Sequence, residues 1–294
     1  MDYPLGWPII PAALVRRQYG LTGGATATVG VGDQVRADQV VAERPGPNGE
    51  RVPILSGIAG RVSQLAPGRS LTVEGPATVV QGLVGLGGVT AGPLHFLPRG
   101  ESLAVVPLPP GVIIVFPGRL PLTLLQRAAA GQVAGIIAGS VAARELEAFT
   151  RTDMTAALDG LVPDLARLPL TLVFTEGIGS FAMDLVVFQM LAQRAGEVAL
   201  LNGATNPHRN ARPELLLPLP PGTKTVSPPL DDTIALGARI RMIAGPKRGA
   251  RGEVVHLFEH QQHVDPGLLV AAARVRLEDG SGAVVPVGFL ERVG

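Results

Sequence analysis

The stretch LGARIRMIAGPKRGARGEVVHLFE, residues 236–259, alternates apolar and charged residues on both sides of a glycine-rich turn. It holds four arginines, four glycines and Lys247, which is one of only two lysines among 294 residues. Alternation with a period of two is typical of half-buried strands. Gly249 stands where the chain must reverse, and glycine adopts a positive φ there at little cost. The stretch therefore predicts a β-hairpin whose apolar side chains, such as Ile240 and Val254, face a small core.

These features resemble the KOW motif, which belongs to SH3-like β-barrels in NusG-type transcription factors and several ribosomal proteins. The alternating segments of residues 272–294 would supply the remaining strands of such a barrel. The resemblance implies a partner among RNA, the ribosome, RNA polymerase or another protein. The partner-binding residues would be the cations of the hairpin, which has no acid among them: Arg239, Arg241, Lys247, Arg248 and Arg251. The alternative is a solvated turn on a domain used for packing or oligomer contacts.

A histidine cluster follows the hairpin in the segment HLFEHQQHVD. Imidazole binds transition metals, so the metal-ligand candidates are His256, His260 and His263. On a helix these three would share a face, whereas the KOW resemblance places His256 in a strand and residues 259–267 in a hairpin loop. The order Glu-His-Gln-Gln-His lacks the HExxH pattern, so the zinc-protease mechanism does not apply.

Residues 1–105 consist of short apolar runs between Gly-Asp, Pro-Gly and Asn-Gly turns, which predicts an all-β region. The order VGVGDQVRADQVVAE followed by SGIAGRVSQLAPGRSLTVEG resembles the barrel-sandwich hybrid of biotinyl and lipoyl domains. A carrier domain of that kind holds its cofactor on a lysine, and this region contains none. Neither biotin nor lipoate is therefore expected. The glycine-rich segment 79–94 lacks the spacing of a nucleotide-binding fingerprint and predicts a glycine-laced β segment.

Residues 106–217 alternate apolar runs with segments of helical periodicity. Strands that are apolar on both faces indicate a parallel sheet covered by helices, here an α/β layer. Ligands bind such sheets at the carboxyl ends of the strands, where the candidates are Gly139, Ser140, Glu176, Gly177 and Gly179. The alternative is that short βα turns need these glycines and that Ser180 caps the next helix.

The expected fold is multidomain α+β. It has a barrel-sandwich-like β domain at 1–105, the α/β layer at 106–217, a Pro-rich linker at 218–235 and an SH3-like β-barrel at 236–294. Hydrophobic residues make up 46% of the chain and charged residues 17%, which supports folded cores. There is no cysteine, which excludes disulfides and thiolate sites. Because the net charge is only +1, binding to nucleic acid requires a local basic patch.

The first residues carry no secretory signal, and no apolar run reaches the ~18–20 residues of a membrane helix. A cytoplasmic protein without membrane contact is therefore expected. Residues 106–203 contain no histidine that could activate a serine nucleophile. The sequence favours a non-enzymatic modular binding or scaffold protein without a cofactor. Two alternatives are a small-molecule- or nucleotide-binding enzyme or sensor with its site at the sheet edge, and a structural self-assembling protein.

Overall fold

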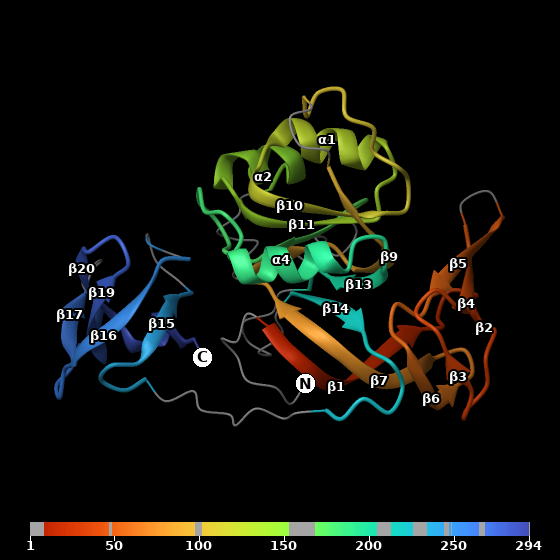
Figure 1. The fold of residues 1–294 in the computed structure, drawn as a ribbon, viewed down its shortest axis with the longest axis horizontal. Helices are drawn as coiled ribbons and strands as arrows, with labels where there is room; N and C mark the ends of the chain where they lie inside the picture. Colours follow the sequence, from red (N-terminus) through yellow and green to blue (C-terminus); the bar gives the residue numbers. More distant parts are fainter. Residues whose placement is uncertain are drawn as a thin grey trace.

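Figure 1 shows the chain in a computed structural model, which describes residues 9–46, 49–97, 102–152, 168–204, 213–225, 234–243, 247, 249–264 and 268–293. Eleven strands belong to one mixed sheet, and the C-terminal residues form a separate five-stranded sheet. Sheets of three and of two strands complete the described β structure. The chain is therefore a strand-rich α+β protein, which is the coarse fold class that the sequence predicts.

The N-terminal strands form two sheets around one core. They are β1 (Ile9–Gly20), β2 (Thr26–Ala27), β3 (Gln34–Val35), β4 (Val40–Pro45), β5 (Arg51–Leu55), β6 (Gly60–Ala66) and β7 (Ser70–Gln81). Strands β2, β4 and β5 make the three-stranded sheet, and the others lie in the large sheet. Val41 and Ala42 from the first sheet join Val62 and Val73 from the second in one apolar cluster. In the expected Gly-Asp turn Gly32 has a φ of 96°, a conformation that favours glycine.

The central strands carry helices on both faces. The elements are β8 (Val84–Leu86), β9 (Val89–Phe96), β10 (Ile113–Leu120), α1 (Leu122–Ala130), β11 (Gly135–Val141), α2 (Ala143–Thr150), β12 (Thr171–Phe174), α4 (Leu185–Gln193), β13 (Val198–Asn202) and β14 (Glu214–Pro218). Successive side chains of a strand point to opposite faces. Ile114 therefore packs in one cluster with Leu124 of α1, whereas Ile113 packs in another with Leu191 of α4. Figure 1 shows α1 and α2 on one side of β10 and β11 and α4 on the other. The predicted cover on both faces is confirmed.

The parallel part of the sheet differs from the prediction. Strands β9, β10, β11 and β12 pair in parallel in that order. Strand β13 instead pairs antiparallel with β9, and β8 pairs antiparallel with β12. The prediction of a purely parallel layer is therefore wrong for residues 198–202. The extra strand, β9, comes from the glycine-rich segment 79–94, which the sequence analysis assigned to the N-terminal domain.

The expected domain boundary at residue 105 does not separate two sheets. Strands β8 and β9 precede it but pair within the central layer, and β14 follows it but pairs with β7 of the N-terminal region. Glycine allows these close approaches, since a Cβ on Gly85 would lie only 2.7 Å from the carbonyl oxygen of Gly203. The glycine-laced β segment predicted at 79–94 is confirmed, and close backbone packing is its physical reason.

The C-terminal strands form an antiparallel sheet in the order β20-β19-β16-β15-β21. Its elements and the neighbouring hairpin are β15 (Arg239–Met242), β16 (Arg251–Leu257), β17 (Gln262–Val264), β18 (Leu268–Val270), β19 (Ala272–Leu277), β20 (Gly282–Pro286), a 3-10 turn (Val287–Phe289) and β21 (Leu290–Arg292). Ile240, Val254, Val275 and Leu290 share one core cluster. The hairpin predicted from the opening stretch is confirmed, because β15 and β16 pair antiparallel. We call residues 236–293 the C-terminal module.

Residues 219–225 lead away from β14, and the amide of Leu219 donates to the carbonyl of Pro76 at 3.0 Å. Pro218, the first residue of the predicted linker, belongs to β14 instead, and residues 226–233 of that linker lie outside the described residues, as does Arg248. None of the helices in the described part of the chain combines the length and apolar character needed to cross a membrane.

Candidate functional site

Arg241 of β15 and Arg251 of β16 stand directly opposite each other in the C-terminal sheet. Like charges in opposite positions destabilise a strand pair unless other groups compensate them. Glu291 of β21 is the neighbour of Arg241 on its other side and accepts from its Nε at 3.3 Å and from its Nη2 at 3.2 Å. The side chains of this ion pair are only 2% and 4% exposed. One of the five predicted partner-binding cations is therefore buried inside the protein.

The carboxyl edge of the central parallel strands supplies the other partners of these arginines. Arg241 Nη1 donates to the carbonyl oxygen of Thr175 at 2.9 Å. Arg251 Nη1 donates to Asp184 at 2.8 Å, and its Nη2 lies 3.2 Å from both carboxylate oxygens of Glu176. The basic hairpin and the sheet edge, which the sequence analysis treated as two separate candidate sites, thus meet in one docked junction.

Asp184 connects this junction to helix α4. Its Oδ1 accepts from the backbone amides of Val186 at 2.8 Å and Val187 at 3.4 Å, so it is the N-cap of α4. The prediction that Ser180 caps this helix is wrong, because α4 begins at Leu185. Burial opposes ionisation of Asp184, but the hydrogen bond from Arg251 and those from the helix amides outweigh it, so the pKa of Asp184 lies below its usual value.

The environment of Arg251 also favours its charged form. Partial burial alone would lower its pKa, but the nearby carboxylates of Glu176 and Asp184 more than offset that effect. The pKa of the guanidinium is consequently raised above its usual value. The contact between Arg251 and Asp184 therefore favours the charged form of both side chains.

Gly249 brings the hairpin turn against the loop between β12 and α4, which carries Glu176 and which we call the central loop. Its φ of 92° confirms the positive φ predicted for the reversal. A Cβ at this position would overlap the carbonyl oxygen of Glu176 and would lie 3.2 Å from the ring of Phe181. Glycine is needed here for two reasons, the turn and the close approach, and the sequence indicates only the first.

The remaining sheet-edge candidates shape the loop that carries Glu176. Ser140 is fully buried, donates to the carbonyl of Phe181 at 2.8 Å and accepts from its amide at 2.9 Å. A Cβ on Gly139 would overlap the amide nitrogen of Met183. Gly177 and Gly179 have positive φ values of 80° and 148°. These four residues hold the loop against β11, so of the five candidates only Glu176 presents its side chain to the junction.

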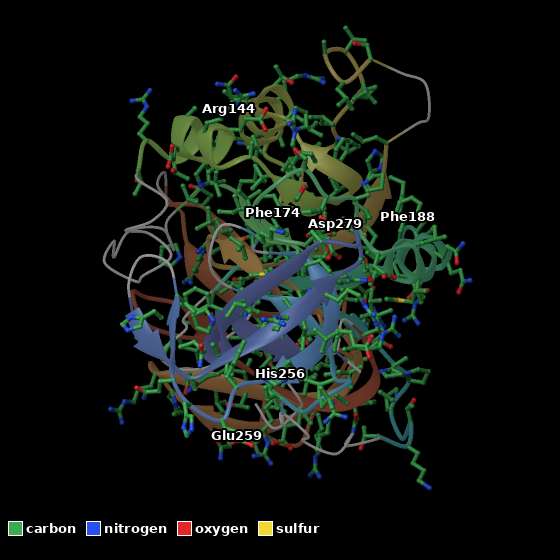
Figure 2. All side chains as sticks on the ribbon, turned by 90° about the vertical axis from the view of Figure 1, so that its left-hand side faces the viewer. Arg144, Phe174, Phe188, His256, Glu259 and Asp279 are labelled. Carbon is green, nitrogen blue, oxygen red and sulfur yellow. The ribbon has the colours of Figure 1, made fainter. Side chains whose placement is uncertain are left out.

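A pocket of about 400 Å³ lies between the loop that carries Glu176 and the C-terminal module. The residues that line it include Glu176, Phe181, Asp184, Arg251, Glu278 and Asp279. Figure 2 labels Asp279 on the C-terminal module, well away from His256. Of the five predicted ligand-binding residues at the sheet edge, only Glu176 lines this pocket.

The next row of the same sheet face is open to solvent. Arg239 lies opposite Glu253, and Glu253 lies opposite Arg276. Arg276 pairs with Glu253 at 2.8 Å, and their side chains are 63% and 44% exposed. These three residues line a groove of about 410 Å³. At the hairpin turn Lys247 is exposed and donates to Ser281 at 2.9 Å. Of the predicted cations, Arg239 and Lys247 are therefore the described ones that face solvent.

A β-bulge places His256 beside this groove. The register between β16 and β19 shifts between Val254 and His256, so that His256 lies opposite Arg274. The ring of His256 meets that of Phe258 edge to face at 4.7 Å, and the guanidinium carbon of Arg274 lies 5.7 Å from the Phe258 ring centre. Sequence reasoning did not select Phe258, Arg274 or Arg276, although the alternation of residues 272–277 puts both arginines on one face.

The histidine cluster is not gathered on one helix. His256 lies in β16, His263 lies in β17, and His260 lies in the turn between these strands. The shared helical face is therefore absent, whereas the strand position expected for His256 is confirmed. Within the described residues no three His, Cys, Asp or Glu side chains are grouped so that they could hold a metal ion.

Neither a scan against models of known protein families nor a search of curated proteins gives a match to this chain.

Proposed function

We propose that this chain is a non-enzymatic modular binding and scaffold protein whose C-terminal module contacts RNA. The module resembles KOW and SH3-like barrels in its alternating strands and its glycine turn. The N-terminal sheets, which enclose one core as in a barrel-sandwich hybrid, would serve as a rigid support.

The open groove on the C-terminal sheet is the observation that carries this proposal. Arg239 and Arg276 line it and are exposed, although Arg276 pairs with Glu253, whereas Arg241 and Arg251 are covered and held by carboxylates at the junction. Phosphate contacts fix a protein on nucleic acid through exposed cations of this kind. Arg239 and Arg276 therefore replace Arg241 and Arg251 as the residues proposed to bind RNA, and Lys247 at the turn adds a third cation.

The test is the salt dependence of RNA binding. Fluorescence anisotropy with a labelled 20-nucleotide RNA is measured from 50 to 200 mM salt for the natural chain and for Arg239→Glu/Arg276→Glu. Reversal of two phosphate contacts should lower affinity at least about tenfold and reduce the salt slope by about 1.4, which is ~0.7 for each contact on a single strand.

The matched control is Arg16→Glu/Arg36→Glu, which makes the same change in net charge. Arg16 and Arg36 are 71% and 81% exposed and lie in the N-terminal region. This control should bind RNA as the natural chain does. Equal affinity of the Arg239→Glu/Arg276→Glu variant and the natural chain would remove the proposal.

A second candidate function, a small-molecule site, is favoured by the junction pocket of about 400 Å³. Its lining combines carboxylates, one guanidinium and the ring of Phe181, so it offers polar groups and an apolar wall together. A thermal-shift screen with nucleotides and divalent metals should raise the Tm with at least one of them. The same screen without any shift would count against a ligand there.

A further inference from the structure

The outer face of β16 and β19 carries a second group of exposed side chains next to the groove. His256 and Arg274 are opposite each other, and both are exposed. Arg274 is also opposite Val284 of β20, which is 42% exposed. With Phe258, which follows β16, these residues form what we call the stacking platform: His256, Phe258, Arg274 and Val284.

The β-bulge is the reason that this platform exists. In a regular strand Glu253 and His256, three residues apart, would point to opposite faces. The extra residue in β16 restores His256 to the face of Glu253, because Arg274 and Arg276 are two residues apart on β19 and pair with His256 and Glu253 respectively. The platform and the groove lined by Arg239 and Arg276 thus lie side by side on one face of one sheet. Figure 2 labels His256 and Glu259 on this module.

The chemistry of the platform suits a planar, electron-rich ring. The guanidinium of Arg274 lies above the Phe258 ring, and His256 lies edge-on to the same ring. These contacts restrict the side chains, so little conformational entropy remains to be lost when a base stacks on them. Unpaired bases stack on aromatic side chains and on arginine planes, whereas a duplex keeps the faces of its bases inside the helix.

We infer that the stacking platform binds an unpaired nucleobase, and that the RNA taken by the C-terminal module is therefore single-stranded. This inference rests on the proposed function. The sugar-phosphate chain lies in the groove against Arg239 and Arg276, and a base of the same strand stacks on the guanidinium plane of Arg274, which Phe258 supports, with the exposed ring of His256 beside it. Because the platform carries no base-edge pattern, it accepts bases with little sequence preference.

The experiment compares three forms of one probe. A 12-nucleotide RNA that contains 2-aminopurine is used as a single strand and as a duplex, and a fluorescein-labelled single strand of the same sequence gives affinities by anisotropy. The full-length chain is compared with Arg274→Lys, which keeps the charge but loses the guanidinium plane, and with His256→Ala, which removes an exposed ring. Arg16→Lys is the matched conservative control.

The expected result is a single-strand affinity at least about tenfold above the duplex affinity, with quenching of 2-aminopurine on binding. Arg274→Lys and His256→Ala should each lower single-strand affinity by at least about fivefold, since loss of one stacked base typically costs that much or more. Both should leave the salt slope unchanged, because neither removes a phosphate contact. Arg16→Lys should match the natural chain.

Two other outcomes distinguish a failure of the stacking platform from a failure of the proposed RNA binding. If Arg239→Glu/Arg276→Glu lowers affinity while duplex and single strand bind equally and Arg274→Lys has no effect, the platform is wrong and RNA binding stands. If neither RNA form binds at any salt concentration, both the function and the platform are wrong. Far-ultraviolet circular dichroism of each variant verifies that a loss of binding is not a loss of folding.

Discussion

Two neighbouring sets of arginines and glutamates on one face of the C-terminal sheet, which we call rows, lie in different surroundings. In the first row Arg241 and Arg251 are opposite each other and are held by Glu291, Glu176 and Asp184. In the second row, two residues further along, Arg239, Glu253 and Arg276 face solvent. The difference between the rows is the central loop, which covers the first and leaves the second open. An arginine in an alternating strand is thus a docking residue or a solvent-exposed residue according to what packs on it.

The largest effect is expected from removing the buried arginine. Arg241→Met leaves the nearly buried carboxylate of Glu291 without its arginine and the carbonyl of Thr175 without this donor. Loss of one partner of a buried pair costs about 3–5 kcal/mol. Urea denaturation of the full chain measures the free energy of unfolding.

The exposed pair provides the comparison for that measurement. Arg276→Met breaks the ion pair with Glu253, whose partners are 63% and 44% exposed, and should cost about 0–1 kcal/mol. Equal losses for Arg241→Met and Arg276→Met would contradict the distinction between the two rows.

A somewhat smaller effect is expected at the docking turn. Gly249→Ala adds a methyl group that overlaps the carbonyl of Glu176, at a φ of 92°. Strain at positive φ and overpacking together should destabilise the protein by about 2–4 kcal/mol. Gly280→Ala is the matched control, because Gly280 has a φ of 82° with nothing within 4 Å of its Cβ position. The control should lose only about 1 kcal/mol, and a difference near zero in thermal or urea unfolding would show that the turn does not touch the loop.

The smallest effect is expected from the pH dependence of the junction. The folded pKa of Asp184 is lowered, so its contribution to stability is fully present above the unfolded pKa of about 3.9 and is lost as pH falls through the folded value. Asp184→Asn should therefore be less stable than the natural chain at pH 7, and the gap should close below about pH 4.

Urea denaturation from pH 7 to pH 2.5 measures that gap. Asp38→Asn is the comparison, because Asp38 pairs with Arg36 at the exposed N-terminal surface and should show a smaller gap. A gap for Asp184→Asn that stays constant with pH would mean that its carboxylate does not stabilise the junction through its charge.

Local patterns predict the elements of this chain well. The alternation of residues 239–257 gives β15 and β16, and the positive φ of Gly249 follows from the need to reverse between them. Apolar runs give β10, β11 and β12 with helices on both faces. Such features depend on neighbours a few positions away, which the sequence displays directly.

The sequence does not show which residues far apart in the chain contact each other. The partners Arg251 and Glu176 are 75 positions apart, and Arg241 and Thr175 are 66 positions apart. The entry of β9 and β14 into the large sheet likewise depends on strands from different regions of the chain. The bulge that turns His256 toward Arg274 exists only in the register between two strands.

The sequence by itself therefore determined which segments are strands and helices, where glycine must turn the chain, and that cations gather on one hairpin. Only the tertiary structure decided that Arg241 and Arg251 are covered and held by distant carboxylates while Arg239 and Arg276 stay exposed to solvent. The physical reason is that backbone conformation depends mainly on local sterics and side-chain periodicity. The surroundings of a charge depend instead on whichever distant surface covers it.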